Sequence, residues 1–393
     1  MNDVTKHTAG YFYANDCNIE EFGEIVSQTL DVSDLSFAFE VKENVPIYDI
    51  AKLRSKLLDE KYRSTILTEW AHVLKNSSGV LVLKGAYSDT SAIDAATDIY
   101  NDIIAAERNE NDGEGDHFTK TGANDRIWNS LQKLCDRSPE TFARYFGNVA
   151  IAAVCEAWLG PNYQMTAQIN LVRPGGTAQQ AHRDYHLGFQ TADVSSQYPA
   201  HVHDLSPALT LQGAVAHTDM PVETGPTKLL PFSQLYLAGY AAWRREDFRD
   251  YFEERQIQLP LTKGDAVFFN PALFHAAGEN FSKDVGRMAN LLQVSSAFGR
   301  AMETVDRKTM SEQLFPAIAK LQGESELAPA EIDAAVAACA EGYSFPTNLD
   351  RDPPLGGLAP ETQQALFHRA IAEKWTLESF VGALQKQAER KGS

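Results

Sequence analysis

Residues 166–171 read Thr-Ala-Gln-Ile-Asn-Leu, so polar and apolar side chains alternate along this stretch. Because successive side chains of a β-strand point to opposite faces, the alternation predicts a strand with one buried face. Similar short runs follow at 209–212, 266–269 and 288–294, with turn-forming residues at 174–176, 224–226 and 263–265. These strands, spread over residues 163–296 and interrupted by a predicted helical insert at about 235–254, indicate a β-sandwich or jelly roll.

The segments on both sides of this β-rich part are predicted to be helical. Apolar residues recur at helical spacing at 66–74, 93–104, 127–134 and 142–158. A glycine-bounded apolar run at 79–84 predicts one buried strand among them. Beyond residue 303, Pro329 and Pro360 stand where the first turn of a helix favours proline. We therefore expect a single domain over residues 1–393 with a mainly β, jelly-roll core: 1–160 mostly helical, 161–300 the jelly roll, and 301–393 a helical C-terminal extension.

The composition is that of an ordinary folded protein with an acidic surface. Of the 393 residues, 44% are hydrophobic, and the formal net charge is −18. Such a charge repels phosphate backbones and anionic lipids, so we expect neither nucleic acid nor a membrane as a partner. The most apolar predicted helix, 148–159, is too short to span a bilayer, and residues 1–6 lack the apolar stretch of a signal peptide. Four widely spaced cysteines indicate free thiols, and we expect a cytoplasmic protein.

The sharpest chemical signal is His182-Arg183-Asp184, which follows an Arg-Pro-Gly-Gly turn at 173–176. On an extended chain, residues two apart share a face, so His182 and Asp184 can reach one metal ion. His275, in a second strand-like segment, can complete the set. Two histidines and one carboxylate on one face of a metal leave other positions open, which is how non-haem Fe(II) oxygenases hold a co-substrate and O2. Zinc sites in proteins more often have all coordination positions filled by protein ligands, so this ligand set favours iron over zinc.

Two other groups of residues have metal-binding character. His217-Thr218-Asp219 repeats the His-x-Asp spacing, but it stands before Met-Pro at the end of a predicted strand. His201-Val202-His203-Asp204 lies in a predicted polar loop. Structural roles are the simpler interpretation of both groups, so we prefer His182 and Asp184 as ligands.

Arg287 lies twelve residues after His275, inside the apolar stretch 286–292. An arginine in a buried strand needs an anionic partner, because an unpaired buried charge is very costly. The far carboxylate of 2-oxoglutarate fits that role, since a guanidinium can hold it through two charge-assisted hydrogen bonds. The alternative is a structural ion pair with an aspartate or a glutamate.

Taken in order, these motifs resemble the phytanoyl-CoA dioxygenase family over about residues 79–296. The matching elements are Arg-Pro-Gly-Gly at 173–176, His-Arg-Asp-Tyr-His at 182–186, Gly-Pro-Thr-Lys-Leu-Leu-Pro-Phe-Ser-Gln at 225–234, Lys-Gly-Asp at 263–265, and His275 with Gly278, Asn280, Ser282 and Arg287. The resemblance implies a double-stranded β-helix fold, Fe(II) as the cofactor, and 2-oxoglutarate and O2 as co-substrates. It also implies iron ligands at His182, Asp184 and His275, with Arg287 holding 2-oxoglutarate.

The sequence departs from the family pattern at two places. The Pro-Gly-Ser-His turn common in the family is Pro-Phe-Ser-Gln here, at 231–234. Ala277, two residues after the distal histidine, lacks the hydroxyl with which some members contact the co-substrate. The segment after residue 303 also lies outside the resemblance.

Polar residues on the predicted strand faces are candidates for lining a pocket: Gln168, Asn170, Thr210, Gln212, and Asn290 or Gln293. We assign Thr210 and Gln212 to the co-substrate, and Gln168 and Asn170 to the substrate. His186 is a candidate for orienting a metal ligand, with a structural histidine as the alternative.

Two irregular segments, 108–124 and 343–354, are too long or too proline-rich for ordinary connections, and we expect them to cover the pocket mouth. Phe345 and Arg351, in the second of them, are candidates for contacting the substrate. The alternative for Arg351 is a surface ion pair with Asp350 or Asp352.

The predicted activity is oxidation of an unactivated C–H bond of a small polar metabolite, with an amino acid as the leading candidate. Hydroxylation is the default outcome, and desaturation or ring closure are variants of it. Alternatives are an acyl-CoA hydroxylase of the same family, a cupin-like isomerase or zinc hydrolase that does not use 2-oxoglutarate, and a silent binding module. A homodimer through the C-terminal helices is a further expectation.

Overall fold

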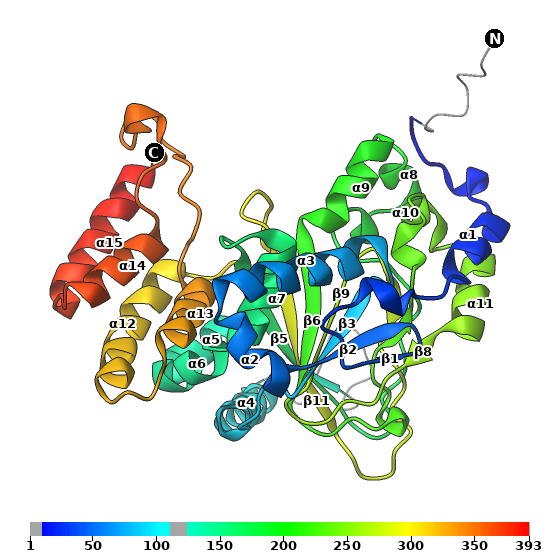
Figure 1. Cartoon of the computed structure of the whole chain (residues 1–393), viewed down its shortest axis with the longest axis horizontal. Coiled ribbons are helices and arrows are strands. Elements are labelled where there is room, and N and C mark those ends of the chain that lie inside the picture. The colour runs from blue at the N-terminus through cyan, green and yellow to red at the C-terminus, as the bar shows by residue number, and fades with distance from the viewer. Residues whose placement is uncertain (1–9, 111–123, 393) are drawn as a thin grey trace.

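The computed structural model describes residues 10–110 and 124–392, and its core consists of two β-sheets (Figure 1). The larger sheet has the strand order β1-β2-β3-β9-β6-β11-β5-β4, and the smaller has the order β10-β7-β8. The strands of the larger sheet are β1 (Glu40–Lys42), β2 (Val45–Asp49), β3 (Val80–Lys84), β4 (Asn124–Ile127), β5 (Gln164–Val172), β6 (Thr210–Ala216), β9 (Ala266–Phe269) and β11 (Arg287–Ser295). Those of the smaller sheet are β7 (Lys228–Leu230), β8 (Ile257–Gln258) and β10 (Phe274–Ala276). The fold is a double-stranded β-helix, or jelly roll, as predicted.

The predicted strands are confirmed, because 166–171 lies in β5 and the other predicted runs fall in β3, β6, β9 and β11. The boundary at residue 160, however, does not follow the sheet. The N-terminal part contributes β1 to β4, and β2 pairs in parallel with β3 through Ile47 and Val82. β1, β2 and β4 were not predicted, because these strands of three to five residues show neither a regular alternation nor a continuous apolar run, and their neighbours in the sheet supply the pairing that holds them.

The larger sheet buries both of its faces, each against different partners. On β11, Met288, Leu292 and Val294 belong to the main hydrophobic core, which the helices share. The alternate residues Ala289 and Leu291 turn to the other face, where the smaller sheet packs. This period of two is what places polar side chains such as Gln293 between the two sheets.

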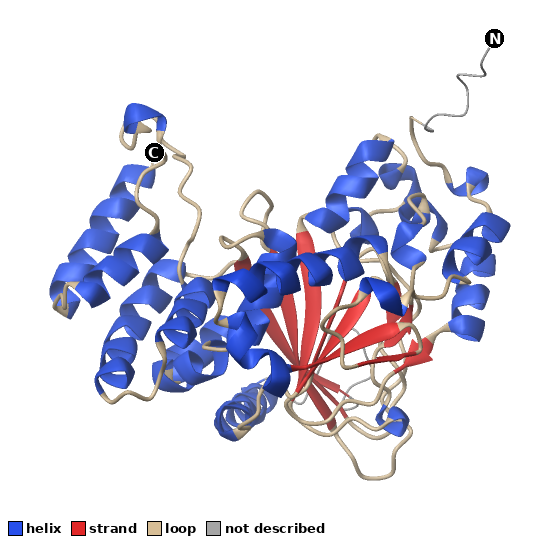
Figure 2. Cartoon of the chain, in the orientation of Figure 1, coloured by secondary structure: helices blue, strands red, loops and turns tan. Residues whose placement is uncertain are grey.

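Helices cover the outer face of the larger sheet and both of its ends (Figure 2). The N-terminal group comprises α1 (Ile19–Val26), α2 (Ile50–Leu57), α3 (Glu60–Asn76), α4 (Ser91–Glu110), α5 (Ser130–Arg137), α6 (Pro139–Phe146) and α7 (Val149–Leu159). Those within the β-rich part are α8 (Ala192–Ser195), α9 (Ala200–Ala208), α10 (Gly239–Ala242) and α11 (Glu246–Arg255), so the predicted helical insert is present in two pieces. None of the helices in the described residues has both the length and the apolar character needed to cross a membrane.

The C-terminal extension consists of α12 (Arg307–Gly323), α13 (Pro329–Cys339), α14 (Gln363–Ala372) and α15 (Leu377–Lys391). The first two of these helices pack against α5, α6 and α7, and α14 and α15 pack on α12 (Figure 1). Phe315 and Phe380 stack, and Phe367 packs edge-on against both, in the same hydrophobic core as the N-terminal helices. This shared core supports our proposal that residues 1–393 form one domain.

The aromatic cluster of the extension gives a test of that proposal. Phe380 is fully buried, so Phe380→Ala should lower the free energy of unfolding by about 3–5 kcal/mol, which denaturant titration can measure. Phe345→Ala is the control: its ring is 61% exposed, and the change should stay within about 0.5 kcal/mol. A separate low-stability transition of the extension in wild-type protein would contradict the single domain.

Candidate active site

The two candidate histidine ligands lie opposite each other on neighbouring extended segments. His182 donates its backbone N–H to the carbonyl of His275 at 3.0 Å, and His275 returns the bond at 3.2 Å. A further backbone bond, from Asp184 to Pro271 at 3.1 Å, continues this antiparallel pairing. The segment around His182 is therefore extended as predicted, although it forms a single bridge rather than a regular strand. The pairing brings together residues that are far apart in the sequence.

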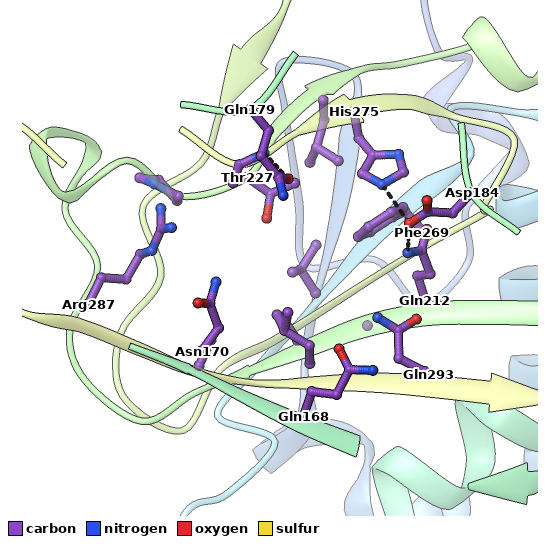
Figure 3. Close-up of a pocket in the computed structure, with 18 of the residues that line it drawn as sticks. Gln168, Asn170, Gln179, Asp184, Gln212, Thr227, Phe269, His275, Arg287 and Gln293 are labelled. Atoms are coloured by element: carbon purple, nitrogen blue, oxygen red, sulfur yellow. Dashed lines mark hydrogen bonds and ion pairs between the residues drawn. The ribbon is translucent and has the colours of Figure 1, made fainter. Parts of the chain in front are cut away.

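Backbone carbonyls orient both imidazole rings. Nδ1 of His182 lies 2.8 Å from the carbonyl oxygen of Gln180, and Nδ1 of His275 lies 2.8 Å from that of Leu273. A carbonyl can only accept, so Nδ1 carries the proton of each neutral ring and Nε2 keeps its lone pair. Nε2 of His182 lies 3.7 Å from Oδ1 of Asp184. Nε2 of His275 lies 3.5 Å from Oδ2 of the same carboxylate (Figure 3). The ligand atoms of the three residues all lie within 4.8 Å of one another, as one metal ion requires.

The surroundings of Asp184 keep its carboxylate charged and fixed. Burial raises the pKa of Asp184, but the imidazoles of His182 and His275 and a hydrogen bond from Gln212 lower it by more than burial raises it. The pKa of Asp184 therefore lies well below its usual range. Nε2 of Gln212 donates to Oδ2 at 2.6 Å, and the hydroxyl of Tyr240 donates to the Asp184 carbonyl at 2.9 Å. Burial also lowers the pKa of His182, which favours the neutral ring that binds metal.

Arg183, between two candidate ligands in sequence, is fully buried and points away from them. Its guanidinium donates to the carbonyls of Ser233 and Tyr236, at 2.5 and 2.8 Å. It also lies over the rings of Tyr240, which contacts Asp184, and of Phe274, which precedes His275. Burial lowers its pKa to about 10, so it remains charged at neutral pH. Arg183 thus ties both ligand segments to the same loop.

We expect Arg183→Met to weaken divalent-metal binding by about 10- to 100-fold, because the supports of metal ligands typically contribute that much. Calorimetric titration with Mn(II) measures the change. Arg307→Met is the control, since Arg307 is a half-buried arginine that likewise donates to carbonyls, those of Met165, Ala338 and Cys339. Equal metal affinities in the two variants would show that Arg183 has no particular role at the site.

The rival histidines have structural roles. His217 is buried between Thr97 Oγ1 and Tyr145 Oη, at 2.8 and 2.7 Å, and burial lowers its pKa to about 3. His203 bonds the carbonyl of Ser195 at 3.0 Å, and Asp204 pairs with Lys75. Among the described residues, the group at His182, Asp184 and His275 is the one that could hold a metal ion.

A cavity of about 470 Å³ opens beside this cluster, between the two sheets (Figure 3). Of the residues proposed from sequence, Gln168, Asn170 and Gln212 line it together with Arg287. Gln293 also lines it, whereas Asn290 turns to the helical face and donates to Tyr145 Oη. Its apolar wall includes Met220, Leu229, Leu259, Leu261, Val267, Phe269 and Leu291.

Arg287 projects into the cavity from the first residue of β11, across from the cluster (Figure 3). Its side chain is buried, with 6% of the residue exposed, and its Nη1 has no hydrogen-bond partner. Burial lowers its pKa to about 10, and no carboxylate of the described residues pairs with it. The structural ion pair considered from sequence is therefore absent from the described part of the chain.

Two residues that were not proposed from sequence lie on the same side of the cavity. Gln179 and Thr227 stand next to each other between Arg287 and His275 (Figure 3). Thr227 supplies a hydroxyl to a cavity in which Ala277 offers none. Its place in the Gly-Pro-Thr motif was a usable signal, but nothing local indicates that this turn faces Arg287.

Several predicted positions lie elsewhere. Thr210 shares the strand face of Gln212 but starts β6 and does not line the cavity, which does not support its assignment to the co-substrate. Gln212 donates to Asp184 and lies away from Arg287 (Figure 3), so its assignment to the co-substrate is not supported either. Phe345 and Arg351 are exposed and do not line the cavity. His186 bonds Ser206 Oγ at 3.2 Å rather than a candidate ligand.

The segment 343–354 does not cover the cavity. Thr347 and Asn348 donate to the carbonyls of Lys391 and Gly392, and Asp352 pairs with Arg390, so the segment is bound to the end of α15. The other expected lid, 108–124, falls mostly outside the described residues. Sequence alone could not show that the proline-rich segment packs against the end of α15 and not over the sheets that enclose the cavity.

A jelly-roll core with two histidines and one aspartate at a cavity between its sheets defines the class of mononuclear non-haem iron, 2-oxoglutarate-dependent dioxygenases. The chain belongs to the phytanoyl-CoA dioxygenase (PhyH) family, whose model matches residues 76–289. This confirms the resemblance read from the motifs.

Similar curated proteins carry dioxygenase names. Dioxygenase trt7 of Aspergillus terreus is 26% identical over 165 residues, 42% of this chain and 52% of the relative. Dioxygenase andF of Emericella variicolor is 28% identical over 142 residues, 34% of this chain and 43% of the relative. The matched segments thus span about half of the length of these relatives.

Solved structures with a similar fold include the epimerase SnoN in complex with Fe3+, alpha-ketoglutarate and nogalamycin RO. It is 17% identical, with a TM-score of 0.41, over 60% of this chain and 85% of its own. AviO1 from Streptomyces viridochromogenes Tue57 is 14% identical, with a TM-score of 0.42, over 59% of this chain and 96% of its own.

Proposed function

We propose that this chain binds Fe(II) through His182, Asp184 and His275 and uses 2-oxoglutarate and O2 to hydroxylate a small molecule. The observation that carries the proposal is Arg287, a buried cation in the same cavity as the cluster, whose Nη1 has no hydrogen-bond partner among the described residues. A dianionic co-substrate suits both ends of this cavity. One of its carboxylates reaches the metal site, and the other neutralises the guanidinium of Arg287.

The residues present suit this metal and co-substrate. Two neutral imidazoles and a charged carboxylate are the donors that non-haem Fe(II) takes, and they leave other positions free. When bound, the iron supplies the activation of O2 that is coupled to the conversion of 2-oxoglutarate into succinate and CO2. Arg287 would hold the far carboxylate, with Thr227 and Gln179 beside it. The apolar wall, including Leu229 and Leu261, excludes water from the co-substrate.

The alternatives have less support. A cupin-like isomerase or hydrolase has no use for a buried, unpartnered Arg287. An acyl-CoA substrate would need a cluster of cations for its phosphates, whereas Arg126 and Arg287 are the lysine or arginine side chains that line the described cavity. We keep hydroxylation as the proposed reaction, with desaturation or ring closure as variants. Arg351, the arginine proposed from sequence to contact the substrate and so able to hold the carboxylate of an amino acid, lies away from the cavity, which weakens the case for an amino acid.

Anaerobic titration tests the proposal directly. Addition of Fe(II) and then 2-oxoglutarate should produce the visible metal-to-ligand charge-transfer band of the chelated co-substrate. The same titration with succinate, which lacks the 2-oxo group, is the control and should give no band. Absence of the band at saturating Fe(II) and 2-oxoglutarate would refute the proposed function.

A further inference from the structure

Three glutamines form a polar wall of the cavity next to the metal cluster. Gln168, Gln293 and Gln212 come from the adjacent strands β5, β11 and β6, and we call them the amide wall. Gln293 stands directly opposite Gln212 in the register of the sheet, and Gln168 stands opposite Leu291. They lie at the far end of the cavity from Arg287 (Figure 3). If 2-oxoglutarate occupies the Arg287 end, the amide wall faces the substrate.

Two oxygens of the amide wall are buried acceptors without a donor. Oε1 of Gln212 and Oε1 of Gln293 have no hydrogen-bond partner. The amide of Gln212 cannot be turned round, because its Nε2 donates to the Asp184 carboxylate, which only accepts. An unsatisfied buried acceptor is unfavourable, so a donor that reaches either oxygen would stabilise this end of the cavity.

The other groups at this end are apolar, aromatic or already bonded. Trp128, Phe189 and Met302 complete the lining there, together with Arg126. Arg126 donates to Oε1 of Gln168 at 3.3 Å and lies over the ring of Trp128. Among the described residues that line the cavity, Asp184 is the one carboxylate, and the candidate metal site uses it. An ammonium group would therefore find no anionic partner in the described lining.

We propose that the substrate is an uncharged, mainly apolar molecule whose hydroxyl group donates to the amide wall beside the metal. This inference rests on the proposed function for its placement of the co-substrate. It replaces the amino acid expected from sequence, because a zwitterion would bring an unpaired ammonium into a cavity without a free carboxylate.

A matched set of probes on one bicyclic skeleton tests the inference: 2-decalol, its methyl ether, 2-aminodecalin and decalin-2-carboxylate. Binding is measured by calorimetry to protein loaded with Mn(II) and 2-oxoglutarate. The alcohol should bind about tenfold tighter than the ether, which accepts but cannot donate, and tighter than both charged probes. Equal binding of alcohol and ether, or tighter binding of either charged probe, would overturn the proposal.

The variant Gln293→Leu assigns the effect to the amide wall. It should remove most of the preference for alcohol over ether, because the leucine side chain has no acceptor. Gln313→Leu is the matched control: Gln313 on α12 also has an unpartnered Oε1 but lies outside the cavity, so the preference should persist. Full preference in the double variant Gln212→Leu/Gln293→Leu, measured on metal-free protein, would refute the assignment, because that variant retains neither free acceptor.

Two further measurements separate this inference from the proposed function. The affinity of each variant for 2-oxoglutarate shows whether its site is folded. The four probes are also titrated into metal-free protein. A wild-type protein that fails to bind 2-oxoglutarate refutes the proposed function, while the alcohol-to-ether ratio on the metal-free protein still decides the substrate class.

Discussion

Asp184→Ala is expected to abolish substrate-dependent succinate formation and to weaken metal binding by more than about 100-fold. Loss of a group that merely supports a metal ligand costs about 10- to 100-fold, and Asp184 is a proposed ligand itself. The substitution also frees Nε2 of Gln212, which then has no carboxylate to bind. Mn(II) calorimetry and succinate release measure the two effects. His182→Ala and His275→Ala should behave alike, because the three side chains converge on one point.

The control for these variants is His201→Ala. His201 is an exposed histidine on α9 and belongs to one of the rival groups, so its loss should change neither metal affinity nor the fold. His217→Ala is a poorer control, since it would empty a buried site between Thr97 and Tyr145. Circular dichroism should show native secondary structure in all ligand variants. Full turnover in any one of them would refute the ligand assignment.

Arg287→Met is expected to change the affinity for 2-oxoglutarate and the stability of the apoprotein in opposite directions. A charge-assisted hydrogen bond contributes about 1.5–3 kcal/mol, so the dissociation constant of 2-oxoglutarate should rise about 10- to 150-fold. The melting temperature of the metal-free protein should rise, because the variant removes a buried cation that pairs with no carboxylate in the described part of the chain. Calorimetry and differential scanning calorimetry measure the two quantities on the same preparation.

Arg287→Lys separates charge from geometry. Lysine keeps the positive charge but cannot form the two parallel bonds of a guanidinium, so its affinity for 2-oxoglutarate should be intermediate. A structural arginine would behave differently from this prediction. If Arg287→Met lowered the melting temperature and left 2-oxoglutarate affinity unchanged, Arg287 would be part of the fold rather than the co-substrate site.

Local sequence patterns were sufficient for the centre of the fold and for two candidate ligands, His182 and Asp184, and the family resemblance added His275. The alternation at 166–171 predicted β5 because side-chain direction in a strand depends only on neighbouring residues. The two-residue spacing of His182 and Asp184 predicted, for the same reason, that both side chains lie on one face of the chain. Arg287 could be recognised because a cation inside an apolar strand is costly wherever the strand lies.

The predictions that the structure does not support share one cause. Tertiary packing decides where a cavity ends along a strand and which elements a loop packs against, and local sequence does not show either. Thr210 has the correct parity for the cavity face of β6, yet the cavity ends before it. Arg351 and Phe345 have suitable chemistry, but their segment is bound to α15. Gln179 and Thr227 were missed because their closeness to Arg287 depends on how the two sheets pack.

The sequence by itself thus indicated the jelly-roll class, the His182 and Asp184 pair and the buried arginine, since each rests on periodicity or on the cost of burying charge, while the resemblance to the family added His275. Only the tertiary structure decided that His182 pairs across the backbone with His275 and that β1 to β4 extend the larger sheet. It alone decided that Gln168, Gln212 and Gln293 form one wall. The physical reason is that these are contacts between segments distant in the chain, and no local preference specifies which distant segments meet.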